Sequence, residues 1–137
     1  MTEIIDPLAN IFNEKEPKDI NDFRNILEEG IESTGANKNL PDIGNFLTKV
    51  EISKKEDHSL TTDIHVPEGE GPFPILVYFH GGGWISGSPK SHRKICHRFA
   101  EAGFLVFNVD YALAPENPFP QGFDECCESV RWVVANA

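Results

Sequence analysis

Residues 75–84 decide the fold, and they read Ile-Leu-Val-Tyr-Phe-His-Gly-Gly-Gly-Trp. The run opens with five apolar residues in a row, which is typical of a strand that is covered on both faces of a parallel sheet. A second apolar run occupies residues 104–107. Between the two runs, Ser88 and Pro89 favour the start of a helix and Gly103 favours its end. This order predicts a βαβ unit and therefore an α/β fold with a mostly parallel sheet and flanking helices.

Two helices are expected to cover this sheet. The helix between the apolar runs carries Ile95, Phe99 and Ala102 as a candidate apolar stripe. A last helix begins near residue 121, and its apolar residues recur at helical spacing, so they are expected to face the sheet. These residues are Phe123, Cys126, Cys127, Val130 and Val134.

The residues before the first apolar run divide into two parts. Residues 49–53 and 60–66 alternate apolar and polar side chains, which predicts a half-solvated β-hairpin. His58 and His65 lie in or near this hairpin and are expected at the surface. Residues 1–45 are predicted to form a separate helical segment, and residues 46–137 the α/β domain.

The helical segment is expected to hold two helices and a linker. Asp6 and Pro7 favour a short first helix, and a second begins near Asp19. The apolar residues at helical spacing are Leu8, Ile11 and Phe12 in the first helix and Phe23, Ile26, Leu27 and Ile31 in the second. Gly, Asn and Pro in residues 35–45 predict the linker.

Composition excludes several classes of protein. The 137 residues hold 12 Lys and Arg against 22 Asp and Glu, a net charge of −10, so binding to nucleic acid or to an anionic bilayer is not expected. No apolar run approaches the roughly 18 residues that would span a membrane. The N-terminus lacks the basic and apolar regions of a signal peptide, so a cytoplasmic location is predicted.

The three glycines at 81–83 require a functional or a conformational reason. Glycine lets a ligand approach backbone N–H groups closely, which suits phosphate or an oxyanion. A dinucleotide fingerprint does not fit, because Ser86 or Trp84 would fall on a required glycine, and no Gly-Lys-Ser/Thr follows for a phosphate loop. Two interpretations of the glycines remain, which are an oxyanion-binding site and a turn that binds no ligand. The spacing of His92, Cys96 and His97 does not suit a metal, so neither a metal nor a cofactor is expected.

Two stretches carry a family resemblance. Residues 80–88 read His-Gly-Gly-Gly-Trp-Ile-Ser-Gly-Ser, and residues 110–120 read Asp-Tyr-Ala-Leu-Ala-Pro-Glu-Asn-Pro-Phe-Pro. In this order and at this spacing they resemble the hormone-sensitive-lipase-like esterases, which are α/β-hydrolases. The resemblance covers residues 46–137. It differs at two positions, because Ala112 stands where these proteins usually have Arg and Glu125 stands where Asp is usual.

The resemblance implies a site and an activity. The N–H groups of Gly82 and Gly83 would bind the oxyanion formed in ester hydrolysis, with Gly81 and His80 completing the loop and Trp84 lining the substrate site. The activity would be that of a serine carboxylic-ester hydrolase that acts on small-molecule esters through an acyl-enzyme. Residues 1–45 would form a cap or lid, whose apolar residues facing the acyl chain would be Leu8, Ile11, Phe12, Phe23 and Leu27.

The catalytic serine, acid and histidine of such an enzyme are not found in the sequence. It contains no Gly-x-Ser-x-Gly elbow. The chain is therefore interpreted as an N-terminal part of a longer α/β-hydrolase, truncated before the nucleophile strand. By itself it is predicted to be inactive and prone to aggregation, because strand 75–79 would lie at an open edge.

Other functions remain open. The same scaffold hosts amide and formamide hydrolysis. Plant gibberellin receptors resemble these esterases but lack the catalytic histidine, so a non-catalytic ligand-binding protein is the alternative. A small scaffold without catalysis is the third possibility.

Overall fold

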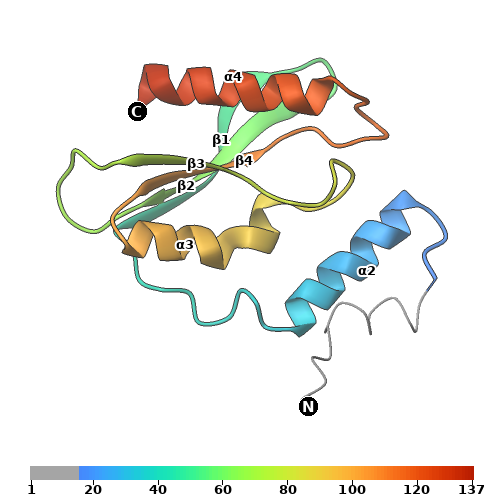
Figure 1. Cartoon of the computed structure of the whole chain (residues 1–137), viewed down its shortest axis with the longest axis horizontal. Coiled ribbons are helices and arrows are strands. Elements are labelled where there is room, and N and C mark those ends of the chain that lie inside the picture. Colours follow the sequence, from blue (N-terminus) through green and yellow to red (C-terminus); the bar gives the residue numbers. More distant parts are fainter. Residues whose placement is uncertain (1–15) are drawn as a thin grey trace, which may run out of the picture.

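The computed structural model describes residues 16–137, and they form a four-stranded sheet with helices on both faces (Figure 1). The strands are β1 (Asn45–Lys54), β2 (Ser59–Val66), β3 (Ile75–Phe79) and β4 (Leu105–Asp110), in the spatial order β1-β2-β4-β3. β1, β2 and β4 are antiparallel neighbours, whereas β3 and β4 are parallel. The predicted strand-helix-strand unit is confirmed, and β3 lies at one edge of the sheet.

The helices are α2 (Ile20–Ser33), α3 (Arg93–Glu101) and α4 (Gln121–Asn136), with a short 3₁₀ helix η1 (Pro89–His92) before α3. α3 and α4 cover opposite faces of the sheet (Figure 1). Asp19 caps α2 through hydrogen bonds that its carboxylate accepts from the N–H groups of residues 21 and 22, which confirms the predicted start of this helix. The first predicted helix, with Leu8, Ile11 and Phe12, lies outside the described residues. No helix among residues 16–137 has the length and apolar character needed to cross a bilayer.

The predicted hairpin is present, but only one of its strands is half solvated. β2 lies between β1 and β4, so both of its edges are paired, and it has buried side chains on both of its faces. Leu60 packs toward α4 with Val109 and Cys126. His65, expected at the surface, is instead fully buried on the α3 face, where its Nδ1 lies 2.9 Å from Nδ1 of His97. The expectation was wrong because the strand pattern does not show that a second helix covers this face.

The predicted helix stripes were also partly wrong. In α3, Phe99 packs against the buried cluster around Cys96, but Ile95 is exposed. In α4, the buried face holds Gly122, Glu125, Cys126, Ser129 and Val133, whereas Phe123, Val130 and Val134 are exposed. α4 packs against β3 and β4, the two strands at one edge of the sheet.

Candidate functional site

The glycine loop after β3 folds back on itself. The carbonyl oxygen of Gly82 accepts hydrogen bonds from the N–H groups of Ile85 and Ser86 at 3.2 and 3.1 Å, and from the Ser86 hydroxyl at 2.9 Å. Gly82 has a φ of 134°, and a Cβ there would lie 2.0 Å from the carbonyl oxygen of Ser86. Only glycine fits this position without a change in the loop.

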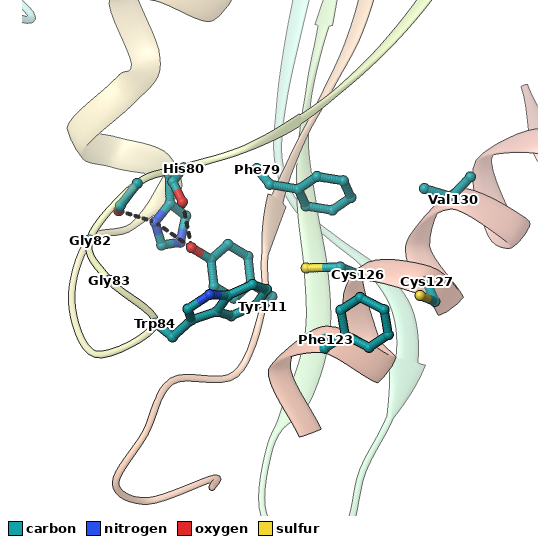
Figure 2. Close-up of a pocket in the computed structure, with 11 residues that line it drawn as sticks. Phe79, His80, Gly82, Gly83, Trp84, Tyr111, Phe123, Cys126, Cys127 and Val130 are labelled. Atoms are coloured by element: carbon teal, nitrogen blue, oxygen red, sulfur yellow. Dashed lines mark hydrogen bonds between the residues drawn. The ribbon is translucent and has the colours of Figure 1, made fainter. Parts of the chain in front are cut away.

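The N–H groups of Gly82 and Gly83 have no hydrogen-bond acceptor among residues 16–137. Both residues line a cavity of about 490 Å³ between the loop and the exposed side of α4 (Figure 2). The cavity is lined by Phe79, His80, Gly81, Gly82, Gly83, Trp84, Tyr111, Phe123, Cys126, Cys127 and Val130. The structure therefore places two free backbone donors beside a largely apolar cavity, and it brings the predicted site residues 80–84 together.

His80 is held against Tyr111 behind the loop (Figure 2). The two rings stack with centroids 4.4 Å apart, and the Tyr111 hydroxyl donates a hydrogen bond to the His80 carbonyl oxygen. The His80 Nδ1–H donates to the carbonyl oxygen of Gly81 at 2.9 Å. Burial lowers the pKa of His80 and raises that of Tyr111 to about 12, so both side chains are neutral at pH 7. His80 is thus held against the loop by its contacts with Tyr111 and Gly81.

Trp84 stands at the mouth of the site. Its backbone has a φ of 67°, its side chain is half exposed, and it lines both the main cavity and a second cavity of about 230 Å³. Its carbonyl oxygen accepts a hydrogen bond from the N–H of Ala114 at 2.9 Å, which ties the glycine loop to the loop that follows β4. Gly122 lets α4 lie close to the Trp84 side chain, because a Cβ at this position would lie 3.3 Å from the indole.

Arg24, which the sequence pattern did not single out, clamps the outside of the site. Its Nε donates to the carbonyl oxygen of Ile85 at 2.7 Å, and one Nη donates to that of Ala114 at 2.8 Å. The guanidinium also binds the Glu116 carboxylate through two hydrogen bonds, which lower the pKa of Glu116 to about 2. α2 is thereby attached to both loops that form the site.

Substitution of Arg24 by alanine is expected to lower the free energy of unfolding of the whole protein by about 1–3 kcal/mol, because two loop carbonyls and a carboxylate lose their donor. Chemical denaturation measures this loss. The matched control is Arg98→Ala, which removes an exposed ion pair with Glu101 on α3 and is expected to cost less than about 1 kcal/mol. Equal losses in the two variants would contradict the clamp.

The part of the predicted lid that the structure describes does not line the main cavity. Leu27 and Ile31 of α2 line a separate cavity of about 130 Å³, which also contacts Gly87, Ser88 and Ser91. The assignment of residues 1–45 as a lid stays a prediction. Among residues 16–137, no three His, Cys, Asp or Glu side chains form a group that could hold a metal ion.

The fold is shared with proteins of known structure. Residues 76–137 match a protein-family model described as alpha/beta hydrolase fold. The chain has the N-terminal part of this fold, as the sequence predicted. An esterase from Pyrobaculum calidifontis superposes with a TM-score of 0.80 and 28% identity, covering 93% of this chain and 41% of that structure. The carboxylesterase EstE1, cloned from a metagenomic library, gives 0.78 and 29%, covering 87% and 40%.

Two curated relatives match part of the chain. Carboxylesterase NlhH of Mycobacterium tuberculosis is 45% identical over 65 residues, which are 47% of this chain and 20% of the relative. Tuliposide A-converting enzyme b1 of Tulipa gesneriana is 45% identical over 67 residues, 47% of this chain and 18% of the relative. The matched stretch spans about a fifth of these relatives. Residues 76–137 therefore match the α/β-hydrolase family model, and the similar proteins include carboxylesterases, in agreement with the resemblance to the hormone-sensitive-lipase-like esterases.

Proposed function

We propose that the whole protein containing this chain is a serine carboxylic-ester hydrolase, and that the chain supplies its oxyanion-binding loop. The observation that carries this proposal is that the N–H groups of Gly82 and Gly83, beside an apolar cavity, have no acceptor within residues 16–137. The carboxylesterases among the similar proteins support it.

The geometry suits charge stabilisation in acyl transfer. When a serine attacks an ester carbonyl, the carbonyl oxygen gains negative charge and needs donors that are already in place. Each such donor contributes about 2.7–4 kcal/mol to stabilising the transition state. The contacts of Tyr111 with His80 and of Ser86 with Gly82 hold the donors before substrate arrives, so little reorganisation is required. The apolar part of the cavity, with Trp84 at its mouth, suits the hydrocarbon part of a small ester.

The remaining catalytic groups must come from other residues of the whole protein, since this sequence holds no Gly-x-Ser-x-Gly elbow. The test is to read the coding sequence after the codon for Ala137 and then to assay the whole protein with p-nitrophenyl acetate. We expect an elbow serine followed by an acid and a histidine, turnover proportional to enzyme, and loss of turnover when that serine is replaced by alanine. An elbow without serine, or no later histidine, would contradict the proposal and favour a ligand-binding role.

A further inference from the structure

The carboxylate of Glu125 is buried in α4 and fully engaged. The residue is 2% exposed. One carboxylate oxygen lies 2.6 Å from Nε2 of His58 and 3.1 Å from the amide nitrogen of Gln121, and the other accepts the N–H of Ala112 at 2.8 Å. A carboxylate this deep in the protein requires a cation or several donors, because burial alone would penalise its charge.

His58 binds this carboxylate from an unexpected part of the chain. It lies in the turn between β1 and β2, 67 residues before Glu125. The resembling esterases usually have Arg at the position of Ala112 and Asp at the position of Glu125, so any ion pair that this Arg makes is missing here. The longer Glu125 side chain is instead bound to His58 and to the backbone at Ala112.

The carboxylate is connected to the glycine loop through Ala112, Tyr111 and His80. Ala112, whose N–H it accepts, directly follows Tyr111, and Tyr111 stacks on His80 and donates to its carbonyl oxygen. His80 in turn donates to the carbonyl oxygen of Gly81. We propose that His58, acting through Glu125 and the backbone at Ala112, is a positioning residue for the oxyanion-binding loop. Its catalytic meaning rests on the proposed function, but the connection itself does not.

The charges around His58 raise its pKa, whereas the pKa values of the other described histidines are lowered. The protonation of His58 can therefore be followed separately. Asp57 binds its Nδ1 at 2.7 Å, Glu125 binds its Nε2, and Asp110 at the end of β4 interacts with it electrostatically. Lys55 of the same turn pairs with Glu128 of α4. Burial opposes the charged imidazole, but the hydrogen bonds with the two carboxylates outweigh this, so the pKa of His58 is raised. Burial lowers the pKa of the four other described histidines, which are His65, His80, His92 and His97.

The test follows the backbone amides of Gly82 and Gly83 by NMR in the whole protein labelled with ¹⁵N-glycine, from pH 5 to pH 9. Amide chemical shifts are followed in place of ester turnover, because a catalytic histidine would dominate the pH profile of ester hydrolysis. We expect both amide shifts to change with one midpoint that coincides with the His58 imidazole titration above pH 6.5. In His58→Gln this step should vanish, and kcat should fall by up to about 100-fold while KM changes little.

Asp57→Asn is the matched control, because it removes the exposed partner of His58 and leaves the Glu125 contact. The midpoints of His58 and of the glycine amides should move to lower pH together. Amide shifts that stay flat while His58 titrates, or that keep their original midpoint in Asp57→Asn, would overturn the proposal. Coupled titration in a wild-type protein that shows no ester turnover would support the positioning connection and reject the hydrolase function. Ester turnover without coupled titration would support the hydrolase function and reject the positioning connection.

Discussion

Substitution of Gly82 by alanine is expected to lower kcat/KM of the whole protein for p-nitrophenyl acetate by about 100-fold or more. The new Cβ would lie 2.0 Å from the carbonyl oxygen of Ser86, so the loop must open and the N–H groups of Gly82 and Gly83 lose their shared orientation. Most of the loss should appear in kcat, because the oxyanion forms in the transition state and not in bound ester.

Gly69→Ala is the control for this variant. Gly69 also has a positive φ, 94°, but a Cβ there would meet nothing within 4 Å, and it lies in the turn before β3, away from the cavity. Its substitution is expected to cost about 1–2 kcal/mol of stability and to leave kcat/KM unchanged. Wild-type activity in Gly82→Ala would exclude this loop as the oxyanion site.

Acid is expected to destabilise the fold through the buried pair of His65 and His97. Burial, with His97 and Arg93 nearby, lowers the pKa of His65 to about 3. Below its ordinary pKa of 6.5, the unfolded chain binds a proton that the native state excludes, so stability is present at neutral pH and is lost as pH falls. The slope is about 1.4 kcal/mol per pH unit, or about 2 kcal/mol between pH 6.5 and 5. Denaturant titrations at pH 7, 6 and 5 measure it.

His65→Phe serves as the comparison for the acid effect. Phenylalanine keeps an aromatic ring beside Phe46 and His97 but cannot bind a proton, so its stability should fall less steeply between pH 6.5 and 5. His58 has a raised pKa and acts in the opposite sense, since the stability that it contributes is present at low pH and is lost above 6.5. The same slope in wild type and in His65→Phe would show that another group causes the acid effect.

Local patterns were sufficient to predict which elements form and in what order. The apolar run of β3, the Ser88 and Pro89 start before η1 and the stop at Gly103 each act over a few residues, and all of them appear in the structure. The glycine loop could be found for the same reason, because Gly82 and Gly83 both have a positive φ and a Cβ at Gly82 would clash with the Ser86 carbonyl.

Contacts between distant residues could not be predicted in this way. Glu125 is buried and Val134 is 78% exposed, the reverse of what hydropathy indicates. The buried Glu125 carboxylate is bound by His58, 67 residues away, and by the N–H of Ala112. Arg24 reaches loop carbonyls 61 and 90 residues away. No spacing rule within one element contains this information.

The bond between His58 and Glu125 has an evolutionary consequence. If a histidine in the β1–β2 turn replaces the usual arginine after the Asp-Tyr pair, then the residues at positions 58, 112 and 125 cannot drift independently. In an alignment of related esterases, histidine at the first position should occur together with a small residue at the second and glutamate at the third. Arginine at the second should accompany aspartate at the third, and mixed combinations should be rare because they leave a buried carboxylate without its cation.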